Sequence, residues 1–76
     1  MAFALSCRTR YDMLRAVTRT SRTVGELAAL VGIHQATASL HVARLVEAGL
    51  ADVTADGNRR LVRARVGAIQ FVLQEG

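Results

Sequence analysis

Proline and lysine are absent from this sequence of 76 residues, and cysteine occurs once. Without proline to interrupt the chain, helices are expected to end at capping residues and glycines. The single Cys7 cannot form a disulfide within the chain, which is typical of a reducing compartment. We therefore expect a cytoplasmic protein with Cys7 as a structural residue, since a redox role would require pairing with Cys7 of a second copy.

Long apolar runs and aromatic residues are also scarce. No apolar run approaches the roughly 18 residues that span a membrane, and residues 1–5 are too short for a secretory signal. With only two Phe and one Tyr, the core must consist of Ala, Val, Leu and Ile. A domain of this length buries only about 60% of the surface of its unfolded chain, so a second subunit would supply the missing burial.

The charged residues are dominated by arginine. Ten basic residues, all of them arginine, against six acidic residues give a formal net charge of +4. The planar guanidinium group suits both phosphate and guanine, and nucleic acid is the usual partner of a strongly basic domain. A GC-rich genome would also favour arginine over lysine, so the charge supports a nucleic-acid partner without establishing one.

The first and last predicted helices each carry an apolar face. Ser6 can cap a helix that runs to about Thr20, and its apolar stripe is formed by Met13, Leu14 and Val17. A short helix over 66–74 closes the chain and is more apolar than an isolated surface helix needs. Its apolar residues are Ile69, Phe71, Val72 and Leu73. We interpret this excess as a dimer contact.

The middle of the chain predicts a helix-turn-helix over 23–48. Thr23 and Glu26 form a capping box, in which each side chain accepts a hydrogen bond from the other residue's backbone amide. The helix that starts there ends at Gly32, and a second helix, over 34–48, ends at Gly49. Its predicted inner face consists of Ala38, Val42, Leu45 and Val46. Two helices joined by a short turn containing glycine are typical of this motif.

A β-hairpin is predicted after the motif. Strands over 51–55 and 60–65 flank the turn Asp56-Gly57-Asn58-Arg59, in which Asp-Gly is a strong hairpin signal. This hairpin, 51–65, would be a wing with Arg59 and Arg60 at its tip. The chain is thus predicted to be one domain, 1–76, that is mainly α with a small β-hairpin (α+β), a winged helix-turn-helix.

The ordered set of motifs resembles the ArsR/SmtB family of winged-helix repressors along nearly the whole chain. The opening segments 3–6 and 9–10 match that family's first signature, and Val24-Gly25-Glu26-Leu27-Ala28 resembles its first motif helix. The run Gly32-Ile33-His34-Gln35-Ala36-Thr37-Ala38-Ser39-Leu40-His41 resembles "Gly-Ile-Ser-Gln-x-Thr-Val-Ser-x-His", and Glu47-Ala48-Gly49-Leu50 its continuation. Three positions depart from the pattern: His34 replaces the N-cap Ser, Arg8 a frequent proline, and Ala43 a common Lys or Arg.

The resemblance implies a homodimer, paired through its first and last helices, that binds a palindromic operator in double-stranded DNA and represses transcription. The corresponding interface residues are Phe3, Leu5, Ile69, Phe71, Val72 and Leu73. It also implies that the helix over 34–48 enters the major groove. The predicted DNA-binding residues are His34, Gln35, Ala36, Thr37, Ser39, Leu40, His41, Arg44, Arg59 and Arg60.

Side-chain chemistry gives these residues different roles. Gln35 can pair bidentately with adenine, and Thr37 or Ser39 can offer a hydroxyl to a base or phosphate. Ala36 and Leu40 suit contact with a thymine methyl. Arginines 44, 59, 60 and 63 are candidate phosphate contacts. The alternative is structural, because short polar residues also stabilise helix N-termini and exposed leucines or arginines often have no function.

Other chemistry finds little support in the sequence. Family members that sense metals use cysteines on the first motif helix or a His/Asp/Glu cluster on the last helix. In this chain, Val24 and Gly25 stand where the cysteines would be, and the last helix has only Glu75 of the second set. His34 and His41 lie about 10.5 Å apart along a helix, too far to share a metal. We expect no metal, no cofactor and no enzyme activity. The alternative function is a winged-helix module that binds a transcription-machinery or other protein partner.

Overall fold

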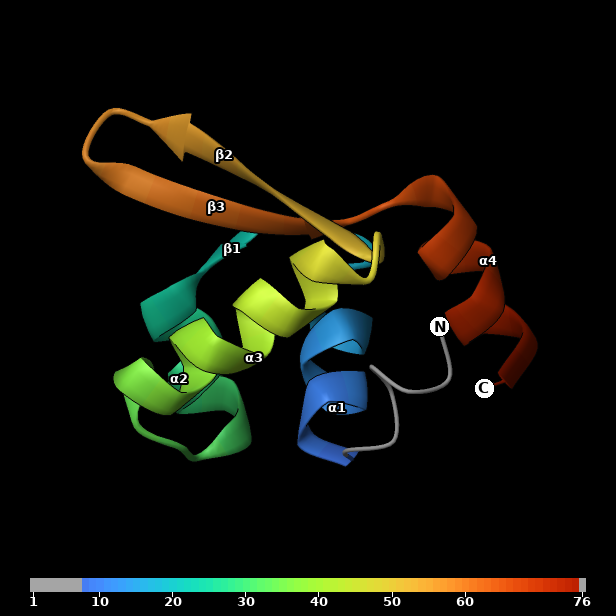
Figure 1. The fold of residues 1–76 in the computed structure, drawn as a ribbon, viewed down its shortest axis with the longest axis horizontal. Coiled ribbons are helices and arrows are strands. Elements are labelled where there is room, and N and C mark those ends of the chain that lie inside the picture. Colours follow the sequence, from blue (N-terminus) through green and yellow to red (C-terminus); the bar gives the residue numbers. More distant parts are fainter. Residues whose placement is uncertain (1–7, 76) are drawn as a thin grey trace.

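The computed structural model describes residues 8–75 of the chain, and the side chains of residues 8–70. The elements follow the order α1 (Arg8–Ala16), β1 (Arg22–Thr23), α2 (Val24–Val31), α3 (Gln35–Glu47), β2 (Ala51–Asp56), β3 (Arg59–Ala64) and α4 (Val66–Glu75). Figure 1 shows the β2–β3 hairpin extending over α2 and α3, with α4 at the end of the molecule away from the hairpin tip. The predicted fold class, mainly α with a small hairpin, is confirmed.

Helix α1 ends at Ala16, so the prediction that it extends to Thr20 was wrong. The helix ends because groups from other elements bind its last backbone carbonyls. The Val17 carbonyl accepts a hydrogen bond of 3.1 Å from the Ala64 amide of β3, where a continuing helix would use the amide four residues later. The Arg22 guanidinium also donates to the Ala16 carbonyl at 3.1 Å and so satisfies a carbonyl at the helix end.

The sheet has three antiparallel strands in the order β1-β3-β2. β3 is central: it pairs with β2 from Ala51↔Ala64 to Asp56↔Arg59, and with β1 at Arg22↔Val62 and Thr23↔Leu61. The sequence did not predict β1, because two residues are too few to show an alternating pattern. β1 leads directly into α2, so the sheet fixes the point at which the helix-turn-helix begins.

Local signals set the ends of the two motif helices as predicted. The Thr23 amide donates to Glu26 Oε1 at 2.8 Å, and the Glu26 amide donates to Thr23 Oγ1 at 3.1 Å, which completes the capping box. Gly32 takes a left-handed conformation with φ of 72° at the end of α2. Gly49 does the same after α3 with φ of 75°, a conformation that L side chains adopt rarely.

The hairpin turn is shorter than predicted. Asp56 and Arg59 form the last pair of the ladder, which leaves Gly57 and Asn58 as the two-residue turn. Gly57 has a positive φ of 64°, and Asn58 does not have a positive φ. Glycine at the first central position is typical of a type II′ turn, whose twist matches that of the flanking strands.

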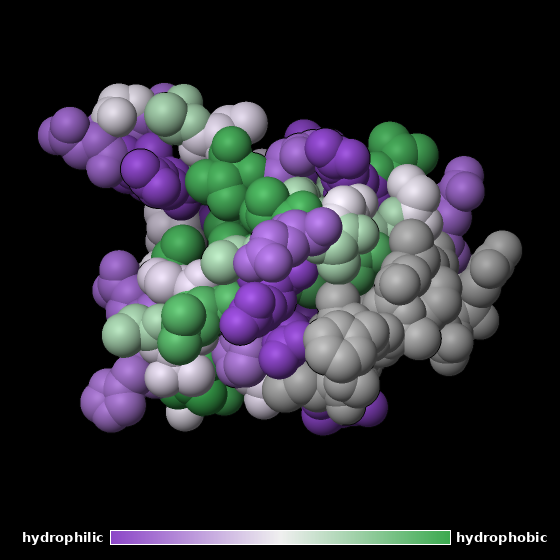
Figure 2. All heavy atoms as spheres, in the orientation of Figure 1, coloured by the Kyte–Doolittle hydropathy of each residue, from purple (hydrophilic) through white to green (hydrophobic). Residues whose placement is uncertain are grey.

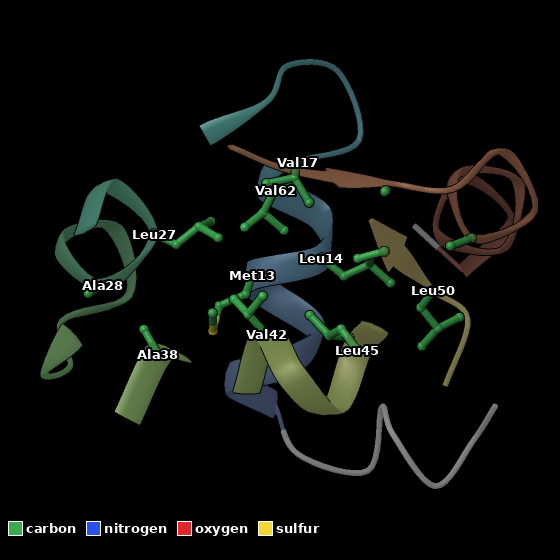
Figure 3. Close-up of a cluster of buried hydrophobic side chains, with 13 residues drawn as sticks. Met13, Leu14, Val17, Leu27, Ala28, Ala38, Val42, Leu45, Leu50 and Val62 are labelled. Carbon is green, nitrogen blue, oxygen red and sulfur yellow. The ribbon is translucent and has the colours of Figure 1, made fainter. Parts of the chain in front are cut away.

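The core joins all four helices to the sheet (Figure 3). Figure 3 shows buried side chains converging from α1, α2, α3, β3 and the loop residue Leu50. The apolar stripe predicted for the first helix is fully buried. Met13 and Leu14 on α1, and Val17 directly after it, are 0% exposed. On α3, Ala38, Val42 and Leu45 are buried, but Val46 is 40% exposed. The prediction that Val46 belongs to the inner face was therefore wrong, because it lies beside β2 where the wing leaves it partly uncovered.

Candidate nucleic-acid interface

Only one face of α3 is used to hold the helix in the fold. Because successive residues of an α-helix are about 100° apart, its exposed remainder divides into three strips. The wing strip, toward the hairpin, consists of Gln35, Ser39 and Val46. The outer strip, opposite the core, consists of Ala36, Leu40, Ala43 and Glu47. The α1 strip, toward the first helix, consists of Thr37, His41 and Arg44. All of these residues are exposed except His41, which is half-buried.

A trough separates the wing strip from the hairpin. One hollow, of about 440 Å³, is lined by Thr23, Val24, Gly25, Gln35, Ser39, Asn58, Arg59 and Arg60. A second, of about 400 Å³, is lined by Val24, Ser39, Val42, Ala43, Val46, Glu47, Val53 and Arg60. They share Val24, Ser39 and Arg60, so they form one continuous trough. Figure 2 shows hydrophilic side chains at the outer end of the hairpin and hydrophobic ones where it approaches α3.

Arg59 ties the hairpin tip to the start of α2. Its Nη2 atom lies 3.9 Å from Glu26 Oε1, and both side chains are more than half exposed. The hydrogen bond from the Thr23 amide lowers the pKa of Glu26 below its ordinary value, and the Thr23 hydroxyl and the nearby Arg59 and Arg22 guanidinium groups lower it further. Glu26 therefore stays ionised at neutral pH and gives Arg59 an anionic neighbour at the edge of the trough. The sequence predicted Arg59 at the tip but gave no signal for this contact, which joins positions 33 residues apart.

The other predicted phosphate-contact arginines are on α3 and on β3. Arg44 Nη1 is 3.5 Å from Glu47 Oε1, one turn further along α3. Arg60 lines both hollows of the trough. Arg63 is exposed on β3 opposite Asp52. The structure thus brings Arg44, Arg59 and Arg60 to the edges of one surface, while Arg63 lies further along the hairpin toward α4.

His41 is held by α1. Arg10 Nε donates to His41 Nδ1 at 3.1 Å, and burial, with the neighbouring Arg10 charge, lowers the pKa of His41 below its ordinary value. A neutral imidazole that accepts at Nδ1 carries its proton on Nε2, so His41 presents a donor at that atom. The sequence did not predict this contact of Arg10, since no local pattern links it to a residue 31 positions away. His34, the N-cap of α3, is exposed and makes no capping hydrogen bond through its side chain.

The predicted dimer-interface residues are only partly within the described structure. Phe3 and Leu5 lie outside the described residues, as does Cys7, and the side chains of Phe71, Val72 and Leu73 on α4 are not among those described. Ile69 is half-buried against the core of its own chain. Val66, at the start of α4, is 72% exposed, so this end of α4 leaves apolar surface uncovered.

The described residues form neither a cluster that could bind a metal nor a helix that could span a membrane. Between residues 8 and 75, no three His, Cys, Asp or Glu side chains come together in a group that could hold a metal ion. None of the described helices has the length and apolar character needed to cross a membrane.

Two helices joined by a short glycine-containing turn, with a β-hairpin beside the second helix, define the class of winged helix-turn-helix domains. The chain belongs to the family described as "Helix-turn-helix domain", whose model matches residues 5–54. No sequence among the curated proteins compared with the chain matches it.

Solved structures share this fold over almost the whole chain. The homodimeric winged helix-turn-helix DNA-binding domain of a possible ArsR-family transcriptional regulator from Mycobacterium bovis is similar with a TM-score of 0.92 at 23% identity, over 97% of this chain and 69% of that one. NolR from Sinorhizobium fredii gives 0.87 at 22% identity, over 97% and 74%. A possible transcriptional regulator for arsenical resistance gives 0.81 at 26% identity, over 95% and 75%. The resemblance to ArsR-type winged helix-turn-helix proteins is thus confirmed.

Proposed function

We propose that this chain is a cytoplasmic, sequence-specific transcriptional regulator that binds double-stranded DNA as a homodimer and represses transcription. One observation carries the proposal: the buried residues of α3 are Ala38, Val42 and Leu45, and the rest of the helix, apart from the half-buried His41, is exposed next to an arginine-bearing hairpin. A helix presented in this way beside a wing can enter a major groove while the wing contacts the neighbouring backbone. The net charge of +4 adds long-range attraction to the phosphates.

The exposed strips of α3 supply the proposed base contacts. Gln35 and Ser39 of the wing strip, and Thr37 of the α1 strip, can donate to and accept from base edges. His34 and His41, two turns apart on the same side of the helix, would donate to phosphates there, with the Nε2 proton of His41 fixed by the Arg10 hydrogen bond. Arg44, Arg59 and Arg60 would contact the backbone, which positions the protein without carrying sequence information.

The proposed homodimer has two supports. A domain of this size has a small core, and the Mycobacterium bovis relative is described as homodimeric. A two-fold dimer binds two half-sites about 34 Å apart, which makes the operator palindromic. The proposed interface includes Phe3, Leu5 and the apolar residues of α4. We further propose that the protein acts without a metal or other cofactor and has no enzyme activity.

Selection of bound sequences from a random duplex pool, followed by gel-shift titration with the full chain, tests this proposal. We expect a preferred palindromic sequence and an affinity that falls steeply as salt is raised, because each neutralised phosphate releases counterions. An affinity that ignores sequence and salt would overturn the proposal and favour the alternative, a winged-helix module that binds a transcription-machinery or other protein partner.

A further inference from the structure

The outer strip of α3 is apolar where a DNA-reading surface would be expected to be polar. Ala36, Leu40 and Ala43 follow one another at helical spacing on the side opposite the core, and Glu47 ends the strip. Leu40 is 66% exposed, and both alanines are exposed. The polar residues of the helix lie on either side of this apolar ridge, defined here as Ala36, Leu40 and Ala43.

The ridge contributes nothing to the fold of the described chain. The inner face of α3 points the opposite way and is complete, since Ala38 and Leu45 are 0% exposed. A single exposed leucine is common and needs no explanation. Three apolar residues in line lie between the wing strip, which carries Gln35 and Ser39, and the α1 strip, which ends at Arg44. Together with the hairpin arginines across the trough, they define a surface that complements a partner with a narrow apolar strip and anionic edges.

We propose that this ridge contacts the C5-methyl groups of thymines in the major groove, with Leu40 as the specificity-determining residue. This inference rests on the proposed function. The thymine methyl is the only apolar group that the base pairs present in the major groove. The phosphates on either side match Arg44 on one side of the ridge and the hairpin arginines beyond the trough on the other. A thymine at the position under Leu40 would therefore be preferred over cytosine, which lacks the methyl group.

The charge around the ridge and its small apolar area favour DNA over a protein as its partner. Leu40 and two alanines offer much less apolar surface than the roughly 800 Å² per partner of a stable protein interface, whereas a thymine methyl needs only a few contacts. Glu47, at the far end of the ridge, would repel phosphates, and Arg44 offsets this only in part at 3.5 Å. The N-terminal half of α3, with Ala36 and Leu40, would then lie deepest in the groove.

Replacing thymine by deoxyuridine tests the inference, because it removes the methyl group and keeps the hydrogen-bonding pattern of the base pair. The probe is a duplex recovered by selection from a random pool, prepared with thymine or with deoxyuridine at each A·T pair in turn. Wild-type protein should bind the duplex with deoxyuridine under Leu40 about fourfold more weakly, the effect of burying one methyl group. Leu40→Ala should bind the two duplexes about equally.

Leu30→Ala is the matched control, since Leu30 is a similarly exposed leucine on α2, 55% exposed. It should retain the wild-type preference for thymine. If no deoxyuridine position weakens wild-type binding, or if Leu40→Ala keeps the full preference, the inference is overturned while sequence-specific binding stands. If the selection recovers no preferred sequence, the proposed function and the inference are both overturned.

Discussion

Gln35 occupies the first position of α3, where its side chain reaches over the start of α2. A Cβ added at Gly25 would lie 3.6 Å from Gln35 Oε1, an ordinary van der Waals distance, so the Gln35 amide lies directly beside the first turn of α2. The amide also borders the trough. This position allows Gln35 to approach a base edge with both its donor and its acceptor, which is the arrangement that adenine requires.

Gln35→Ala should therefore relax the base preference at one position of each half-site. A bidentate pair contributes about 1–3 kcal/mol of discrimination against the wrong base, and the alanine variant should lose most of it. Gel-shift titration against duplexes that carry each of the four base pairs at that position measures the change. An unchanged preferred sequence would mean that Gln35 does not lie on the base-reading surface.

Arg59→Ala should weaken binding to all sequences by a similar factor. Its guanidinium is at the wing tip, and a phosphate contact carries no base information. The slope of log affinity against log salt should fall by about 1, as expected for one lost phosphate contact. Gln35→Ala is the control, because it should leave this slope unchanged. If Arg59→Ala changes the preferred sequence instead, the wing tip contacts bases.

His41 should make folding stability depend on pH. In the unfolded chain it takes up a proton near pH 6.5, whereas burial and Arg10 lower its pKa in the folded protein. The unfolded state therefore binds more protons in this window, and stability rises with pH. The contribution of His41 is complete above pH 6.5 and is lost as the pH falls toward the lowered pKa.

Denaturant unfolding at pH 5 and pH 7.5 measures this effect. The wild type should lose more stability at pH 5 than His41→Asn does, because the variant lacks the titrating group. His34→Gln changes the exposed histidine at the N-cap and should keep the wild-type pH dependence. Equal losses for wild type and His41→Asn would show that the imidazole is not protected from protonation in the folded protein.

Helix α2 depends on its capping box. The Thr23 hydroxyl accepts from the Glu26 amide, and in its absence this amide at the helix start would have to find water as its partner. Thr23→Ala should therefore cost about 1 kcal/mol in the free energy of unfolding. Thr20→Ala, at an exposed residue whose hydroxyl makes one hydrogen bond of 3.4 Å, should change it by less than about 0.5 kcal/mol. Denaturant unfolding of both variants measures the difference, and equal losses would contradict the capping role.

The elements that could be predicted from sequence are those whose signals lie within a few residues. The capping box at Thr23 and the glycines at 32 and 49 determine helix ends through local backbone geometry, and the sequence shows them directly. The end of α1 could not be found this way, because the Val17 carbonyl binds an amide 47 residues later. Strand β1 was missed for the same reason, since its two residues are defined by pairing with β3.

The same distinction between local signals and long-range contacts applies to the candidate site. The motif placed Gln35 and Leu40 on an exposed helix surface, and the structure agrees. The contacts of Arg59 with Glu26 and of Arg10 with His41 join distant elements, and no spacing in the sequence predicts them. Val46 was assigned to the core by its apolar side chain, but its exposure depends on how closely the hairpin approaches α3.

At the scale of the whole molecule, the proposed dimer determines how two copies of α3 are presented to DNA. Phe71→Ala, on α4, should shift the protein toward monomers because it removes apolar surface from the proposed interface. Sedimentation equilibrium over a range of concentrations measures this change. Gln70→Ala, at an exposed residue beside it in the sequence, is the control and should remain dimeric. An intact Phe71→Ala dimer would remove Phe71 from the interface.

Thr23 has two structural roles, since it is the last residue of β1, paired with Leu61 of β3, and also the N-cap of α2. The central strand of the sheet, β3, and the first helix of the motif, α2, are therefore connected through Thr23, and the Arg59–Glu26 contact adds a second connection. We expect these two connections to limit movement of the hairpin tip relative to the helix-turn-helix. In the proposed complex, a duplex that contacts both α3 and the hairpin would have to adjust its groove width, so stiff and pliable sequences would differ in affinity even at base pairs that no side chain touches.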